Sequence, residues 1–213
     1  MLGANKEIIY ARSEIMRIVE TFIVKDGMSS KRRSTYLEFS ARNLDTNKKF
    51  QLIDKDYRYM HVFELHCGIN WRDIWRIVWI DDPVIKENMF NDMALIGFMS
   101  TSDPEFADLE YRSMRDVDRI SKLIIRYHQE RVLPFFEKWS DYHNVKEEFF
   151  TLSDAVKKIT LLPSDASRIA IAIALVDGDR GLALKLIKEH GLYFKSEPKM
   201  ERFFETLRAR GLV

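Results

Sequence analysis

Hydrophobic positions near the start of the chain recur at intervals of three and four residues, as they do along one face of an α-helix. The repeat consists of Ile8, Ala11, Ile15, Ile18, Val19 and Phe22. It ends near Val24, and Gly27 follows, a residue type that readily takes the left-handed conformation that closes many helices. The pattern therefore predicts an N-terminal helix with one buried face.

Beyond Gly27 the period changes to two, which is the spacing of side chains on one face of a β-strand. Leu37 and Phe39 alternate with Glu38 and Ser40, and the turn-forming residues 43–47 then predict a hairpin back into a second strand at 50–53. The longest alternation follows. Residues 57–69 place their more apolar members on one face, in the order Tyr57, Tyr59, His61, Phe63, Leu65, Cys67 and Ile69.

The segment from Trp71 to Ile80 allows two interpretations. Trp71, Trp75 and Trp79 are four residues apart, which would stack them on one face of a helix. However, residues 74–80 are β-branched or aromatic except for one arginine, and this composition favours a short turn at 71–73 followed by a strand. We expect the strand.

Helical patterns dominate the remainder. Asp82 and Pro83 are typical of a helix start, and apolar residues then recur through 84–99. A long helix is expected from Ser113, and Pro134 should kink or end it. Shorter helices are predicted at about 144–150, 153–159, 164–177, 179–190 and 197–210, with Ser153 and Ser164 as N-caps, Gly191 and Gly211 as C-caps and Pro198 in a first turn.

These elements predict an α+β fold, with an N-terminal helix packed on an antiparallel sheet of about four strands and a mostly helical C-terminal half. We expect an α+β domain at 1–142 and a helical bundle at 143–213, packed together as one unit. The apolar run Ile169–Val176 should be the buried centre of that bundle.

Cysteine usage and hydropathy indicate a cytoplasmic protein. The single cysteine, Cys67, cannot form an intramolecular disulfide and suits a reducing compartment. The run Ile169–Val176 is the longest apolar stretch and is far shorter than the ~20 residues that a membrane-spanning helix needs. Charged residues near the N-terminus also leave no apolar signal-peptide core.

An acidic stretch is the first candidate for function. Residues 81–110 contain eight acidic residues and one basic residue, a net charge of −7 in a chain whose formal net charge is +1. Some of these acids suit helix N-termini. The candidate partner-binding residues are Asp81, Asp82, Glu87 and Asp92, with Trp71 and Trp75 as aromatic anchors. This pattern predicts a non-enzymatic protein that binds a basic protein partner through an acidic face.

A basic stretch supports another interpretation. Residues 25–49 contain seven basic and three acidic residues, a net charge of +4, and include Lys31, Arg32 and Arg33. Such a hairpin can contact phosphates, so nucleic-acid binding is one alternative. Charged residues also protect exposed strand edges from aggregation, which is the purely structural explanation.

Motifs for catalysis, metals and cofactors are missing from the sequence. It has no GxSxG, HExxH, CxxC, GxGxxG or P-loop pattern. A calcium loop starting at Asp177 fails, because its sixth and twelfth positions hold Leu182 and Lys188. We therefore expect no metal and no cofactor. A small hydrolase or transferase with a cleft containing Glu64 and His66 is the remaining enzymatic alternative.

Three runs of sequence resemble a bacterial family of unknown function: SKRRSTYLEF, YMHVFELHCGIN and LPFFEKWSD. Members of that family open with a helix, enter a sheet through basic and aromatic residues, and often lie in toxin–immunity gene neighbourhoods. The resemblance covers roughly Asn5 to Asp141. It implies an immunity-like or antitoxin-like role, and it carries over no catalytic residues.

Overall fold

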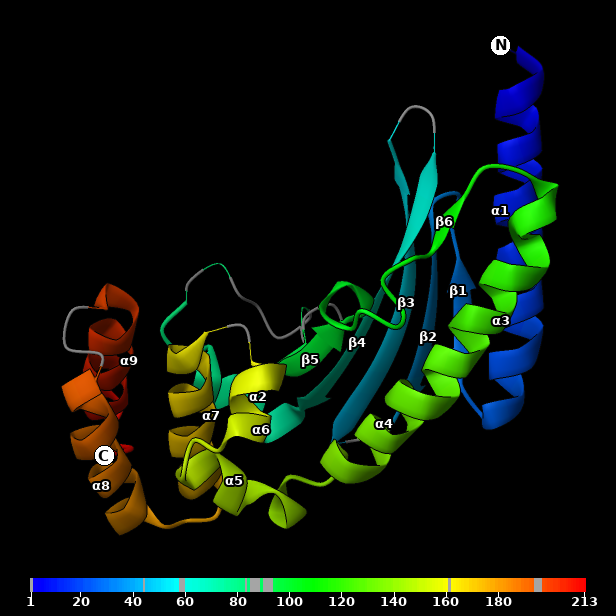
Figure 1. The fold of residues 1–213 in the computed structure, drawn as a ribbon. Coiled ribbons are helices and arrows are strands. Elements are labelled where there is room, and N and C mark those ends of the chain that lie inside the picture. Colours follow the sequence, from blue (N-terminus) through cyan, green and yellow to red (C-terminus); the bar gives the residue numbers. More distant parts are fainter. Residues whose placement is uncertain are drawn as a thin grey trace. The chain divides into compact units, whose positions relative to one another are not determined.

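The computed structural model confirms the α+β fold: an N-terminal helix, an antiparallel sheet and a helical C-terminal half follow one another along the chain (Figure 1). The residues that the structure describes are 2–43, 45–57, 60–82, 84, 89, 94–160, 162–193 and 197–213.

The sheet has six strands within the described residues, in the order β1-β2-β3-β4-β5, and β6 pairs with β4. Their bounds are β1 Ser29–Arg32, β2 Tyr36–Arg42, β3 Thr46–Asp56, β4 His61–Trp71, β5 Ile96–Met99 and β6 Glu110–Tyr111. The predicted hairpin between β2 and β3 is confirmed. The sequence does not reveal β1, β5 and β6, because each is too short to show an alternation of apolar and polar residues.

The chain packs into two compact units. The first consists of residues 1–42, 48–68 and 98–137, and the second of residues 43–47, 69–97 and 138–213. Each unit is therefore assembled from separate stretches of sequence. The domain boundary expected after residue 142 is a statement about which parts of the chain fold on their own. It stays a prediction, because compact units of the folded chain do not test it.

In the first unit, two helices pack against each other beside the sheet, as Figure 1 shows: α1 (Leu2–Ile23) and α3 (Val117–Tyr127). The apolar face predicted for the first helix is buried, and Ala11, Ile15 and Val19 have no exposed surface. Leu37 and Phe39 of β2 are buried to the same extent. Because side chains alternate along a strand, this apolar contact directs the intervening residues of β2 to the opposite face of the sheet.

A buried carboxylate joins four elements of this unit. The side chain of Asp54, near the end of β3, is 1% exposed. It accepts a hydrogen bond from Tyr111 Oη on β6 (2.7 Å), and Arg12 Nη1 on α1 and His61 Nδ1 on β4 each lie 3.0 Å from it. Burial, reinforced by Asp54, raises the pKa of Tyr111, so the phenol stays protonated and donates. A buried charge needs such partners.

Pro134 does not stop the helix that contains it. The chain passes from α3 through a π-helical turn at His128–Val132 into α4 (Leu133–Trp139). A proline ring clashes with the carbonyl four residues earlier. The wider π turn immediately before the proline accommodates that position, with the Leu133 amide donating to the His128 carbonyl five residues back.

The second unit contains α2 and the C-terminal helices. The helices are α2 Arg72–Val78, α5 Lys146–Phe150, α6 Asp154–Ile159, α7 Pro163–Val176, α8 Arg180–Tyr193 and α9 Pro198–Ala209. The five helices predicted at the C-terminus are therefore confirmed. The prediction that 169–176 forms the buried centre is confirmed for residues 169–174, which have no exposed surface.

The strand expected within 71–80 is wrong, because residues 72–78 form helix α2. Its apolar residue Val78 lies four positions after Ile74 and three after Trp75, and all three are buried. A helix buries these three on one face, and this tertiary contact overrides the β-propensity of the individual residues.

Other boundary predictions need correction. The helix expected over 84–99 is wrong at its end, where Ile96–Met99 forms β5, and most of its earlier residues lie outside the described ones. Ser164 is a buried residue within α7, whose N-cap is Leu162, and α8 continues through Gly191. The caps at Ser153 and Gly27 are confirmed. The predicted C-terminal cap at Gly211 is confirmed as well, because this residue lies just beyond α9 with φ at +67°.

The π turn generates a prediction about pH. His128 has no exposed surface, and neither ring nitrogen has a hydrogen-bond partner among the described residues. Burial lowers its pKa below 6.5, although Asp26 opposes the shift from 3.6 Å away. Below the unfolded pKa of 6.5 the unfolded chain binds a proton that the folded chain does not, so stability should fall as pH falls. Urea midpoints should decrease from pH 7.5 to 5.5.

Replacement of His128 by phenylalanine should flatten this decrease, since one histidine accounts for at most about 1.4 kcal/mol per pH unit. His190 is also buried with a lowered pKa, so a residual slope should persist. His143, whose side chain is 58% exposed, provides the control, and His143→Gln should keep the wild-type slope. Equal slopes for His128→Phe and wild type would refute the assignment.

Candidate functional site

The strand β1 presents its two faces to different surroundings. Ser30 and Arg32 turn toward α1: Ser30 Oγ donates to Glu20 Oε1 (2.6 Å), and Arg32 Nη2 donates to the Ser13 carbonyl (2.8 Å). Because side chains alternate along a strand, Ser29 and Lys31 lie on the opposite face.

The neighbouring strand β2 continues this opposite face. Its register places Ser40 beside Ser29 and Glu38 beside Lys31. Leu37 and Phe39 are buried on the other side of the strand. The polar side of these two strands is called the open face below, and it consists of Ser29, Lys31, Tyr36, Glu38, Ser40 and Arg42.

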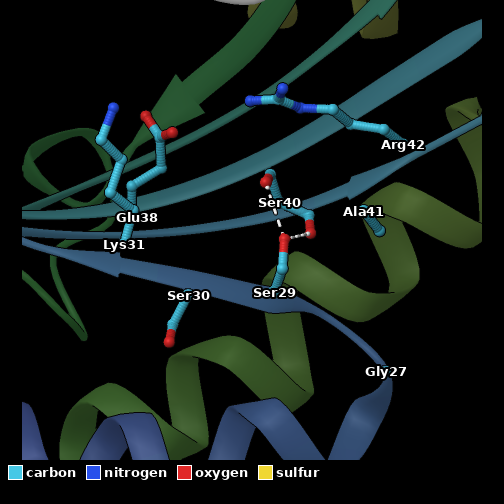
Figure 2. A pocket seen from close by; sticks show the side chains of 8 residues that line it. All are labelled: Gly27, Ser29, Ser30, Lys31, Glu38, Ser40, Ala41 and Arg42. Carbon is cyan, nitrogen blue, oxygen red and sulfur yellow. Dashed lines mark hydrogen bonds between the residues drawn. The ribbon is translucent and has the colours of Figure 1, made fainter.

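A cavity of about 570 Å³ lies at this face. It is lined by Gly27, Ser29, Ser30, Lys31, Glu38, Ser40, Ala41 and Arg42. Figure 2 shows Lys31 and Glu38 rising from the neighbouring strands and Arg42 extending on the same side. The two serines meet between them, where Ser29 Oγ donates to the Ser40 carbonyl (2.9 Å) and lies 3.2 Å from Ser40 Oγ.

The charge of this cavity is positive. Its one carboxylate, Glu38, is already matched by Lys49 Nζ at 3.2 Å and by Gln51 Nε2 at 2.7 Å. Lys31 and Arg42 are exposed, and neither forms an ion pair within the part of the chain that the structure describes. Both cationic heads are therefore available to an anion from outside.

The outer edge of β1 is also available. All four residues of β1 are exposed, and β1 pairs only with β2 among the described strands. The amide of Arg33 donates to the Tyr36 carbonyl (2.8 Å), so the backbone groups of Arg33 point toward β2. Inward and outward backbone groups alternate in an antiparallel pair. The amides and carbonyls of Ser30 and Arg32 therefore point away from β2.

The three basic residues of the nucleic-acid hypothesis do not all point to one face of the sheet. Lys31 is on the open face, whereas Arg32 is turned toward α1 and lies 3.9 Å from Glu20. Arg33 lies over the ring of Tyr36, 5.5 Å from its centroid. Sequence reasoning missed Ser29 and Ser40, and it counted Arg42 only as one of the seven basic residues of the stretch 25–49. The alternation of β2 contains the signal for Ser40 and Arg42, but nothing in the sequence pairs residue 29 with it.

Asp81, the first residue of the expected acidic face, has a side chain that is 1% exposed. It accepts a hydrogen bond from Arg168, which also donates to the Val78 carbonyl, and Arg202 Nε lies 3.6 Å away. The Arg168 guanidinium lies over the ring of Phe203, 4.6 Å from its centroid. Asp81 thus neutralises a buried arginine inside the second unit and is not on the surface.

The aromatic anchors expected beside it are buried too. Trp71 and Trp75 are each 3% exposed, and Trp71 Nε1 donates to the Ser140 carbonyl (3.1 Å). Asp82 is half-buried and accepts a hydrogen bond from the Val84 amide (2.9 Å). Two other candidate residues, Glu87 and Asp92, lie outside the described residues.

Acids later in the stretch are matched by arginines from the helical segment that follows. Asp103 lies 2.8 Å from Arg131, and Glu105 lies 3.0 Å from Arg131 and 2.5 Å from Arg126. Asp81, Asp103 and Glu105 therefore contribute less free negative charge than a count along the sequence suggests, because the compensating arginines come from outside residues 81–110.

Glu64 and His66, the residues of the enzymatic alternative, lie 3.5 Å apart, and Lys55 Nζ is also 3.5 Å from Glu64. Neither residue lines the cavity at the open face or the second cavity described next. No group of three or more histidine, cysteine, aspartate or glutamate residues within the described ranges can hold a metal ion.

A second cavity, of about 590 Å³, lies in the second unit beside Trp71 and Tyr142. Two of its lining residues already have partners. Asp141 accepts a hydrogen bond from the His143 amide (3.0 Å), and Tyr142 Oη donates to Asp177 (3.2 Å), a residue next to the lining.

Comparisons with protein-family models, with curated proteins and with solved structures found no match to this chain. The toxin–immunity resemblance therefore stays a prediction. Among the helices that the structure describes, none combines the length and the apolarity needed to cross a bilayer.

The pairing of Asp81 with Arg168 predicts a large loss of stability when either is replaced. Asp81→Asn should leave the Arg168 guanidinium buried without a matching charge and cost about 3–5 kcal/mol of unfolding free energy. Urea unfolding measures this loss. Asp82→Asn, at a half-buried neighbour, should change stability by no more than about 0.5 kcal/mol.

Replacing both partners tests whether the loss comes from an unmatched buried charge. In the double variant Asp81→Leu with Arg168→Met no charge remains buried, so much of the stability lost in Asp81→Asn should return. Equal stability of Asp81→Asn and wild type would contradict the assignment of Asp81 to the interior.

Proposed function

We propose that this protein is a non-enzymatic protein-binding protein and that it binds an acidic, extended segment of its partner along β1. The observation that carries the proposal is the combination of an exposed edge strand with two cations, Lys31 and Arg42, that no carboxylate of the described residues compensates. The contact surface consists of the outer edge of β1 and the open face beside it.

The edge supplies backbone hydrogen bonds. An extended segment can add to a sheet as a further strand when donors and acceptors of the edge strand face outward. Ser30 and Arg32 offer an amide and a carbonyl each. Main-chain pairing of this kind is independent of the partner's side chains, so specificity must come from the charges and pockets next to the edge.

The charges favour an acidic partner. Glu38 is matched by Lys49 and Gln51, so an incoming carboxylate meets Lys31 and Arg42 without a competing internal anion. A lysine on an edge strand also disfavours pairing with strands that carry no acidic residue to match its charge, which limits unspecific pairing. The proposal thus reverses the polarity expected from the sequence. Its support is that Asp81, Asp103 and Glu105 are already paired with arginines.

A protein segment suits this surface better than nucleic acid. Nucleic-acid affinity comes chiefly from neutralising several phosphates in a row. Among the described residues the open face offers Lys31, Arg42 and Arg33, which lies over Tyr36, whereas the intervening Arg32 is turned toward α1, so the basic run 31–33 does not present its charges in one row. An edge strand, in contrast, matches the geometry of an extended polypeptide.

A defined peptide tests the proposal. An eight-residue peptide of alternating threonine and glutamate should bind the wild-type chain in isothermal titration calorimetry at low salt. The double variant Lys31→Ser with Arg42→Ser should bind it at least about tenfold more weakly, because each charged contact contributes on the order of 1 kcal/mol. The matched control is Arg180→Ser with Lys185→Ser, which removes the same charge from exposed positions of α8 and should bind as wild type does.

The role of the edge has its own variant. Ser30→Pro removes one outward amide, and proline is tolerated where an edge amide faces solvent. This variant should keep the fold and lose affinity for the threonine–glutamate peptide, whereas Ser30→Ala should bind like wild type. Tight binding of a threonine–lysine peptide instead, or of oligothymidylate with a steep salt dependence, would overturn the proposal in favour of the acidic-face or nucleic-acid alternative.

A further inference from the structure

The donors around the cavity at the open face suit a more specific ligand than an acidic side chain in general. A carboxylate presents two oxygens, whereas a phosphoryl group presents three and, at neutral pH, carries between −1.5 and −2 charges. A site for the latter needs several donors that converge together with more than one cation. The lining offers one ammonium, one guanidinium and the Ser40 hydroxyl, because Ser29 Oγ and Ser30 Oγ already donate to the Ser40 carbonyl and to Glu20.

Of the two central serines, Ser40 can donate outward. Ser29 Oγ donates to the Ser40 carbonyl (2.9 Å), so the hydroxyl of Ser29 has already used its one proton. The Ser40 hydroxyl lies 3.2 Å from Ser29 Oγ and has no second acceptor among the described residues. It can rotate to donate to an oxygen of a ligand, since a hydroxyl proton turns freely about the C–O bond.

The cations lie on both sides of these hydroxyls. Along β2, Glu38, Ser40 and Arg42 project from the same face in that order, and Lys31 stands opposite Glu38 on β1 (Figure 2). An anion above Ser40 would therefore have the Lys31 ammonium on one side and the Arg42 guanidinium on the other. A guanidinium is the fork-shaped donor that fits two phosphate oxygens at once.

The size of the cavity also favours more than a bare carboxylate. Its volume of about 570 Å³ exceeds that of a single small anion, and its lining reaches the start of the edge strand at Gly27 and Ser30. A side chain of a segment lying along β1 would enter it from that edge.

We infer that the cavity of the open face binds a phosphoryl group on a serine side chain of the partner segment. This inference rests on the proposed function, because the segment that carries the phosphoserine is the strand added at β1. Ser40, Lys31 and Arg42 are the recognising groups. The phosphate of a nucleic acid has related chemistry, and the edge strand beside the cavity favours the peptide.

The test uses the full chain and four peptides derived from the threonine–glutamate sequence. Two carry phosphoserine at one or the other of two neighbouring central positions, and two carry unmodified serine there. Neighbouring side chains of a strand point to opposite faces, so only one of each pair can reach the open face. At pH 7.5 one phosphopeptide should bind at least tenfold more tightly than its serine counterpart, and the other should gain far less.

A variant of the cavity tests which side chain produces the tighter binding of the phosphopeptide. Ser40→Ala should reduce the advantage of the phosphopeptide while leaving binding of the serine peptide within about twofold, because the change removes neither the edge nor a cation. Ser40 lies on the open face rather than in the core, and an unchanged urea midpoint verifies that the variant is folded. Lowering the pH from 7.5 to 5.0 should also reduce the advantage, because the second phosphate proton binds with a pKa near 6.

The outcomes separate the two proposals. If all four peptides bind equally well, the phosphoryl site is refuted and the acidic-strand function stands. If none binds, both fall. If octathymidylate binds more tightly than either phosphopeptide and Ser40→Ala weakens it, the cavity serves nucleic-acid phosphates and the inference is overturned. An equal gain for both phosphopeptides indicates charge attraction alone and also refutes a built site.

Discussion

The alternation of side chains along β2 is the constraint on which the candidate site depends. Leu37 and Phe39 have no exposed surface, and their burial fixes which way every other residue of the strand points. A shift of one residue in register would bring Glu38 and Ser40 into the core and expose both apolar side chains. The same contact that stabilises the first unit thereby holds Glu38, Ser40 and Arg42 together on the open face.

A second interaction supports this arrangement from within. Asp54 binds Arg12, His61 and Tyr111, which belong to α1, β4 and β6. A buried carboxylate satisfied by three donors specifies one packing of these elements, because any other leaves a charge or a phenol without a partner. The network holds α1 against the sheet. Arg32 and Ser30 then attach β1 to α1 through Ser13 and Glu20. The edge strand is thus fixed on one side and open on the other.

Much of the fold follows from the sequence, because long periodic segments determine their own structure. The first helix, the β2–β3 hairpin and the C-terminal helices all have repeats of several turns or strand residues. The short strands have no such repeat. The sequence predicts a strand where α2 lies, because Ile74, Trp75 and Val78 have β-propensity, but the fold buries them on one helical face. Two helix ends also differ from the expectation based on a proline or a glycine. The π turn before Pro134 and the continuation of α8 through Gly191 both depend on tertiary packing.

The candidate site was harder to predict than the fold, because charge along the sequence differs from charge on the surface. Asp81 is neutralised by Arg168, which lies 87 residues away in the sequence, and Glu38 by Lys49. Only the folded structure shows which charges remain. Lys31 and Arg42 are two of these, and they come from two strands whose pairing no pattern in the sequence reveals.

Amide hydrogen exchange tests the central claim most directly. Exchange is measured at single residues with and without the threonine–glutamate peptide. If the partner segment adds to the sheet, the amides of Ser30 and Arg32 should become protected, because they point outward from β1 and would donate to the new strand. Protection that leaves these two amides unchanged and appears instead between Asp81 and Glu110 would contradict the account and favour the acidic stretch as the contact surface.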